Sequence, residues 1–251
     1  MTKGFYNLTS GVLSQTRRLD VVANNMVNLA TPGYKTEQYT DSTFEEVMMS
    51  LVGNKDKTGA QPIGQESYIL APSELYVDYS QGSLEETGQN LDFAIVGEGY
   101  FAVDTADGVE YTRGGSFSLD DAGYLYLPAH GRVLGMDGQP IYLPTDNIRA
   151  DGFGRIYSAD GTALLGQIGV FTFADNAQMV KNPSGLFGPN GQAPAAAGGE
   201  VRWQWVENSN VDMVREMSQM MSSQRALQSA AQVLTLYDQL LTRATTELGR
   251  L

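Results

Sequence analysis

Apolar positions near the carboxyl end of the 251-residue chain recur at the spacing of a long amphipathic helix. Residues 211–241 contain no Gly or Pro, and every seventh residue from position 213 is Met or Leu. Apolar residues at this heptad spacing form a stripe that is buried against another helix. Such a helix extends about 45 Å at 1.5 Å per residue, which is longer than a small domain can cover. The stripe comprises Met213, Met217, Met220, Leu227, Ala230, Ala231, Leu234, Tyr237 and Leu241.

A second stripe lies near the amino end and predicts a helix over residues 4–29. Two series of heptad positions run through this segment, and all but Gln15 are apolar or aromatic. One such stripe alone is more often a helix packed on a globular core, and that alternative stays open. Two stripes at opposite ends of the chain favour a paired terminal helical domain of residues 1–30 and 208–251. The amino-terminal positions are Phe5, Leu8, Val12, Leu19, Val22, Met26 and Leu29.

The first helix is expected to end near Leu29 or Ala30, where the sequence turns to Thr-Pro-Gly-Tyr-Lys. Pro32 biases the preceding residue away from helical geometry, and Gly33 suits a tight turn with a positive φ. We expect this turn to be mobile in the free chain and to act as a hinge. Asn24, Asn25 and Asn28 lie near the end of the helix, where their amides could cap carbonyls or bind a neighbouring segment.

The residues after this turn carry weaker signals. Ser42 followed by Glu45 is a capping-box pattern and predicts a short helix. Residues 53–65 are polar and rich in Gly and Pro and therefore predict a loop. Residues 68–79 are expected to hold extended pieces interrupted by Pro72.

Residues 91–206 predict an antiparallel all-β domain, so the fold class is α+β with coiled-coil-like terminal helices. Short alternating apolar runs are separated by turns containing Asp and Gly, which accept the backbone angles of tight hairpins. Val201, Trp203 and Trp205 are expected on one face of a strand, with the tryptophans in the core. Residues 182–200 predict a mobile loop. The hairpin turns are 106–108, 121–123, 137–138, 151–152 and 160–161.

Three segments resemble the bacterial flagellar rod and hook protein family. They are ANNMVNLATPGYK, which includes Asn24, Asn25, Asn28, Pro32, Gly33, Tyr34 and Lys35; LDFAIVGEGYFAV with YTRGGSF; and ENSNV with QRA. The chain length is similar to that of the rod proteins, proximal or distal. The resemblance implies that the terminal helices form the core of a helical tube, residues 31–90 an extended connection, and residues 91–206 an outer β-domain. It also implies partners: copies of the chain, other rod and hook axial proteins, and the flagellar export apparatus.

Composition removes several other classes of function. A formal charge of −13 disfavours nucleic acids and anionic membranes as partners. The chain has no cysteine, so thiolate metal sites and disulfides cannot form. No basic start followed by an apolar run is present, so we expect no cleavable signal peptide. The family resemblance implies export to the flagellar basal body.

No pattern of catalytic or cofactor-binding residues is visible, so we expect no enzyme, cofactor, metal or small-molecule substrate. The Asp-Gly segments lack the spacing of a calcium loop. His130 is the single histidine and lies in a turn-like Pro-Ala-His-Gly segment. The leading interpretation is a structural rod subunit that transmits motor torque. The alternative is a carbohydrate-binding or carbohydrate-acting β-protein whose terminal helices pair only within the chain.

Overall fold

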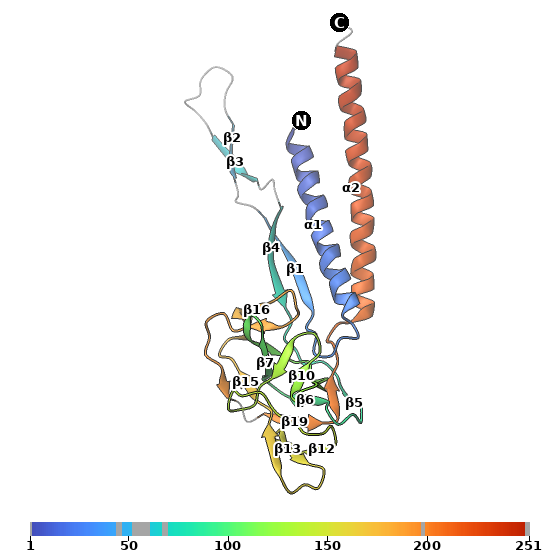
Figure 1. Ribbon diagram of the computed structural model, residues 1–251. Coiled ribbons are helices and arrows are strands. Elements are labelled where there is room, and N and C mark those ends of the chain that lie inside the picture. The colour runs from blue at the N-terminus through green and yellow to red at the C-terminus, as the bar shows by residue number, and fades with distance from the viewer. Residues whose placement is uncertain (1, 44–46, 52–60, 67–69, 197–198, 249–251) are drawn as a thin grey trace. The chain divides into compact units, whose positions relative to one another are not determined.

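The computed structural model describes residues 2–43, 47–51, 61–66, 70–196 and 199–248. The chain divides into two compact units (Figure 1). Unit 1 comprises Met1–Met26, Glu37–Tyr76 and Asp212–Leu251, and unit 2 comprises Val27–Thr36 and Val77–Val211. The chain therefore crosses between the units at residues 26–27, 36–37, 76–77 and 211–212.

Unit 1 contains the two terminal helices and two strand pairs. β1 pairs with β4, and β2 pairs antiparallel with β3. The helices run in opposite directions (Figure 1). The elements are α1 (Thr2–Val27), β1 (Glu37–Thr43), β2 (Val47–Leu51), β3 (Gln61–Glu66), β4 (Leu70–Val77) and α2 (Met213–Leu248).

The helix starts and ends follow local chemistry. Asp212 caps α2, because its Oδ1 accepts hydrogen bonds from the backbone N–H of Val214 at 2.9 Å and of Arg215 at 3.2 Å. α1 ends at Val27, two residues before the expected Leu29, and Asn28 to Thr31 form a turn. The terminal helices are thus confirmed as elements.

Two expectations for the segment after the first turn were wrong. Ser42 lies in β1 and residues 47–51 form β2, so no helix includes the described part of this capping-box segment. Residues 61–65, expected in a loop, belong to β3, whereas 53–60 lie outside the described residues. Pairing between segments determines the secondary structure of residues 47–51, because the apolar run of β2 forms an antiparallel pair with β3.

Unit 2 is built from short antiparallel strands around an apolar core. Its largest sheet has the order β16-β17-β8-β7-β11-β10-β9, with β15 also against β7 and β18 against β15. The strands are β5 (Leu84–Glu86), β6 (Phe93–Val96), β7 (Tyr100–Thr105), β8 (Gly108–Thr112), β9 (Ser118–Leu119), β10 (Leu125–Leu127), β11 (Gly131–Val133), β12 (Ile148–Ala150), β13 (Arg155–Ser158), β14 (Leu164–Gln167), β15 (Val170–Thr172), β16 (Val180–Lys181), β17 (Phe187–Gly188), β18 (Ala195–Ala196), β19 (Glu200–Trp203) and β20 (Trp205–Glu207), with a 3-10 helix at Asn176–Gln178.

The antiparallel strands expected from the Asp-Gly spacing are confirmed. The 106–108 turn joins β7 to β8, the 151–152 turn joins β12 to β13, and the 160–161 turn joins β13 to β14. Residues 182–200 do not form one continuous loop, because β17 and β18 lie within them. The main core cluster is aliphatic and aromatic: Phe93, Ile95, Phe101, Phe117, Leu125, Val133, Ile141, Leu143, Ile148, Ile156, Ile168, Val170 and Val201.

The two tryptophans do not share one face. Gln204 has a φ of 65°, which ends β19 and restarts the chain as β20. Trp203 packs against the core cluster, whereas the Arg202 guanidinium lies 5.2 Å from the centre of the Trp205 ring. The prediction of strict alternation from Val201 to Trp205 was wrong at Trp205. The left-handed conformation of Gln204 changes the side of the strand on which the following side chains lie.

Candidate functional site: a buried polar cluster in unit 2

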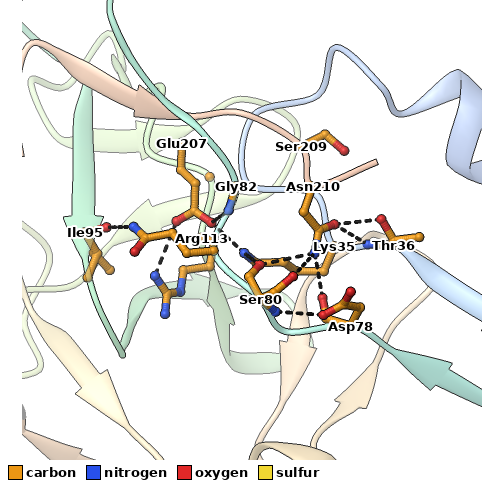
Figure 2. Close-up of polar contacts among 12 residues, drawn as sticks. Lys35, Thr36, Asp78, Ser80, Gly82, Ile95, Arg113, Glu207, Ser209 and Asn210 are labelled. Carbon is orange, nitrogen blue, oxygen red and sulfur yellow. Dashed lines mark hydrogen bonds and ion pairs between the residues drawn. The ribbon is translucent and has the colours of Figure 1, made fainter. Parts of the chain in front are cut away.

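Three segments of unit 2 that are far apart in the sequence meet in one polar cluster (Figure 2). They are residues 33–36, 78–82 and 207–210, and each lies within a few residues of a point where the chain crosses into unit 1. A fourth contribution comes from Arg113, directly after β8. The cluster therefore brings together three of the four chain ends of unit 2, those near Thr36, Val77 and Val211.

Glu207 is the centre of the charged part of the cluster. Its Oε1 accepts hydrogen bonds from Lys35 Nζ at 2.5 Å and from the backbone N–H of Gly82 at 3.0 Å. Its Oε2 lies 3.3 Å from Arg113 Nη1. Lys35 Nζ also donates to the backbone carbonyl of Ser80 at 2.7 Å. Two cations from distant segments thus share one carboxylate.

This charged group is almost completely removed from water. The side chains of Lys35, Arg113 and Glu207 are 1%, 5% and 0% exposed. Burial lowers the pKa of Lys35, and the adjacent Glu207 carboxylate opposes that shift. Buried ion pairs are costly to break, because the remaining charge has neither water nor a partner. The cluster therefore favours one arrangement of its segments.

Asn210 forms the uncharged part of the cluster. Its Oδ1 accepts hydrogen bonds from the Thr36 backbone N–H at 2.8 Å and from the Thr36 hydroxyl at 2.7 Å. Its Nδ2 donates to the carbonyls of Asp78 at 2.9 Å and Ser80 at 3.1 Å. One amide side chain thus joins all three segments, using both its acceptor and its donor groups.

Gly33 belongs to the folded interior of unit 2, so the expectation of a mobile hinge at this residue was wrong. Its N–H donates to the Glu207 carbonyl at 2.7 Å, and its φ is +72°, as the sequence indicated. A Cβ at this position would lie 2.0 Å from the backbone nitrogen of Gly114. Two features therefore require glycine at position 33: its positive φ and the close approach of the Gly114 backbone. Tyr34 is also buried, with Lys181 Nζ 3.8 Å from its ring centre.

The expected stripe residues of the helices are placed unevenly. Val22 is buried, whereas Met213 and Met217 are 49% and 43% exposed. The side chain of Phe5 lies outside the described residues, and Leu29 belongs to unit 2. Ala231 is exposed, and the remaining stripe residues are partly buried: Leu8, Val12, Leu19, Met26, Leu29, Met220, Leu227, Ala230, Leu234, Tyr237 and Leu241.

The three asparagines of the first turn differ in role. Asn25 is buried, with its Oδ1 accepting from the N–H of Glu37 at 3.0 Å and its Nδ2 donating to the Glu37 carbonyl at 2.8 Å. It also hydrogen-bonds to the Glu216 carboxylate of α2. Asn28 forms the turn with Thr31, and Asn24 is exposed.

Neither a metal-ligand cluster nor a membrane-spanning helix is found among the described residues. No group of three or more histidine, aspartate or glutamate side chains among the described residues is placed to hold a metal ion. Within the same residues, neither helix has the length and apolarity needed to cross a bilayer.

Comparison with known proteins identifies the family. Models of three domains match: "Flagella basal body rod protein" at residues 5–35, "Flagellar hook protein FlgE/F/G D1 domain" at 94–150, and "Flagellar basal body rod FlgEFG protein C-terminal" at 204–247. The flagellar basal-body rod protein FlgG of Bacillus subtilis is 35% identical, over 96% of this chain and 97% of its own length. This chain belongs to the flagellar rod and hook protein family.

Other relatives agree over nearly the whole length. FlgG of Agrobacterium fabrum is 30% identical over 92% of this chain and 94% of its own, and the rod protein FlgF of Mesorhizobium japonicum is 31% identical over 93% and 92%. The names of these relatives describe basal-body rod proteins, and none of these matches supports a carbohydrate-acting protein.

Each of the three matched domains contributes to the buried cluster. Lys35 lies in the first, Arg113 in the second, and Glu207 and Asn210 in the third. Sequence reasoning did not select these four residues as site residues, although the segments that carried the resemblance contain all of them. In the structure these four residues belong to one cluster, because each side chain binds a residue of another segment.

Proposed function

We propose that this chain is a structural subunit of the flagellar basal-body rod, which assembles with copies of itself and with other rod and hook axial proteins. In this proposal α1 and α2 pair in a coiled-coil-like manner and provide contacts between subunits, and the assembled tube transmits motor torque to the hook. Family membership and the names of the relatives support the rod assignment.

The observation that carries the assembly step is the number of apolar side chains left in water on the helices. α2 has many apolar side chains that are exposed to water, and exposed apolar surface of this extent is typical of an interaction site. Head-to-tail contacts, in which two different surfaces of identical subunits meet, generate an open helical assembly when they do not close a ring. The α2 residues concerned are 43–74% exposed: Met213, Val214, Met217, Met221, Val233, Leu236 and Leu240.

The remaining parts of the proposal concern location and chemistry. The basal body is the proposed location, since the relatives are named as its components. We propose that the flagellar export apparatus delivers the chain without removal of a signal peptide, and that the protein has no enzymatic activity. The rod function requires neither a cofactor nor a nucleic-acid partner.

The test uses the full-length chain in a flagellated bacterium that lacks its own copy of the gene. The unchanged chain is expected in purified basal bodies. Leu236→Asp with Leu240→Asp should prevent incorporation, because both leucines are solvent-exposed in the free chain and a charge would be buried on assembly. Thr235→Asp with Gln239→Asp is the matched control on neighbouring exposed polar positions. Incorporation of the leucine variant at the control level would contradict the proposed contact.

A further inference from the structure

Two hairpins of unit 2 carry the same sequence pattern. Residues 117–127 read FSLDDAGYLYL and form β9 and β10, and residues 148–158, which begin 31 residues later, read IRADGFGRIYS and form β12 and β13. Aligned without a gap, the two segments share an aspartate, a glycine and a tyrosine. The identical pairs are Asp120 and Asp151, Gly123 and Gly154, and Tyr126 and Tyr157.

The strand register repeats together with the sequence. The cross-strand pairs of the first hairpin are Leu125 with Leu119 and Tyr126 with Ser118. Those of the second hairpin are Ile156 with Ala150 and Tyr157 with Arg149. Each pair of the second hairpin is therefore a pair of the first, moved by the same number of residues. Because register decides which face of a strand each side chain occupies, equivalent residues have the same facing.

Equivalent apolar residues of the two hairpins pack on one core. The main core cluster of unit 2 includes two buried residues from each hairpin, and one partly buried residue of each packs against it. The equivalent residues are Phe117 and Ile148, Leu119 and Ala150, and Leu125 and Ile156. The two hairpins thus cover the same core with the same positions.

The aspartate fixes the turn in the same way in both hairpins. Asp120 Oδ1 accepts hydrogen bonds from the N–H of Ala122 at 3.0 Å and of Tyr124 at 2.7 Å. Asp151 Oδ1 accepts from the residues at the same two offsets, Phe153 at 2.9 Å and Arg155 at 3.0 Å. One side-chain oxygen therefore binds two backbone donors in each turn.

The backbone of the two turns agrees as well. Gly123 donates to the Asp120 carbonyl at 2.9 Å, and Gly154 to the Asp151 carbonyl at 3.2 Å. Both glycines have a positive φ, of 84° and 73°, which a residue with a side chain rarely adopts. The N–H of each aspartate donates to the carbonyl four residues later, at 2.9 Å in the first turn and 3.1 Å in the second.

The likeness ends at the third strand. Tyr126 lies opposite Arg132, whereas Tyr157 lies opposite Leu164, one residue further along the chain than the equivalent position. The register of the second hairpin's neighbour shifts between Ile156 and Tyr157. The equivalence therefore covers one hairpin of each sheet and not the strand that follows it.

We infer that residues 117–127 and 148–158 are two copies of one hairpin module, and that Asp120 and Asp151 are equivalent positioning residues that fix its turn. The D1-domain match ends at residue 150 and the carboxyl-terminal match begins at 204, so most of the second copy lies between the matched segments. The inference gives this stretch a defined structural role and does not depend on the proposed rod function.

Exchange of the two segments within the full-length chain tests the module. Swapping residues 120–127 with residues 151–158 keeps the composition and puts each residue at its equivalent position. The melting temperature of unit 2, followed by the fluorescence of Trp203 and Trp205, should change by less than about 5 °C, because the core exchange is Leu for Ile.

A swap that is shifted by one residue is the matched control. Exchanging 120–127 with 152–159 also keeps the composition, but it places tyrosine at the buried positions 125 and 156 and a side chain at the positive-φ positions 123 and 154. This control should lower the melting temperature by more than about 15 °C or abolish cooperative unfolding. Equal loss in the in-register swap and in the shifted swap would overturn the equivalence.

Single substitutions test the two aspartates independently of the swaps. Asp120→Ala and Asp151→Ala should each lower the melting temperature by about 4–8 °C, since each turn loses two hydrogen bonds. Asp151→Asn should restore most of the loss, because the amide oxygen still accepts both. Asp120→Asn should restore less, because the ion pair with Arg132 is also lost. Asp121→Ala, at an exposed position of the same turn, should have no effect. Asparagine variants no more stable than the alanine variants, or alanine variants as stable as Asp121→Ala, would overturn the positioning role.

Discussion

Units 1 and 2 bury different kinds of side chain. In unit 2 the core is aliphatic and aromatic, and several of its residues are completely inaccessible to water. On the two helices of unit 1, the described residues that are buried are mostly polar: Ser14, Val22, Asn25, Glu216 and Ser223. The leucines and methionines of α2 from Met213 to Leu241 stay partly or largely exposed.

This difference indicates which unit is complete in the free chain. Unit 2 removes its apolar surface from water by itself, and removal of apolar surface is the dominant favourable contribution to folding. Unit 1 leaves apolar surface on its helices and holds its elements together through polar contacts such as Asn25 with Glu37. We therefore expect unit 2 to unfold at higher denaturant concentration and unit 1 to gain stability from assembly.

The largest expected effect is loss of the central carboxylate of unit 2. Glu207→Ala would leave Lys35 and Arg113 buried without an anion, which costs about 3–5 kcal/mol for a broken buried ion pair. Urea unfolding, followed by the fluorescence of Trp203 and Trp205, measures this cost. Glu85→Ala is the control, because Glu85 is exposed. An equal effect in both variants would contradict the role of the buried charges.

Gly33→Ala should be the second most damaging change. Alanine in the left-handed region costs about 1–2 kcal/mol, and overlap with the backbone of Gly114 adds about 1–3 kcal/mol. Gly88→Ala separates the two contributions, because Gly88 has a φ of +69° and no heavy atom beyond its own chain neighbours lies within 4 Å of the position that its Cβ would take. Melting temperatures of unit 2 in both variants give the comparison. Equal shifts would show that the close approach to Gly114 does not matter.

Val22 and Leu227 should respond differently to the same substitution. Val22→Asp places a charge at a position that is 2% exposed in the free chain, and should cost unit 1 several kcal/mol. Leu227 is only partly buried, so Leu227→Asp should change the free chain by less than about 1 kcal/mol and still abolish motility. Helix melting and swimming assays measure the two effects. Normal motility in Leu227→Asp would show that Leu227 does not face a neighbouring subunit.

The smallest expected effect is a pH dependence of unit 1. Burial raises the pKa of Glu216 above its ordinary 4.5, the Asn25 hydrogen bond and Arg215 oppose this shift, and Asp212 adds to it. The folded state then retains a proton that the unfolded state has released, so stability falls as pH rises from about 4.5 through the folded pKa. Helix unfolding measured across this window should depend less on pH in Glu216→Gln. Identical pH profiles would exclude Glu216 as the titrating group.

Much of the fold followed from local sequence patterns. The heptad stripes predicted both helices, because the apolar residues on one side of an amphipathic helix recur every three or four positions. The turns containing Asp and Gly marked four β-hairpins of unit 2, which are β7–β8, β9–β10, β12–β13 and β13–β14, since only certain residues accept the backbone angles of tight turns. The positive φ of Gly33 was also predictable for this reason.

The sites that depend on distant segments were not predictable in this way. Nothing in the neighbourhood of Lys35 shows that its partner is Glu207, 172 residues away. The left-handed Gln204 reversed the expected facing of Trp205, although its own residue type does not require that conformation. The segment after Ser42 was expected to be helical, but residues 47–51 form a strand. The stabilisation of a strand comes from its pairing with another segment, which the local sequence does not show.

The sequence by itself therefore determined the elements whose causes are local: two long helices, the hairpins between them, and membership in the flagellar rod and hook family. The tertiary structure alone decided that the three family segments share one buried ion cluster, and that Gly33 is packed inside unit 2. The physical reason is that a buried charge or a close backbone contact is fixed by what the fold brings beside it, and that partner is not a property of the local sequence.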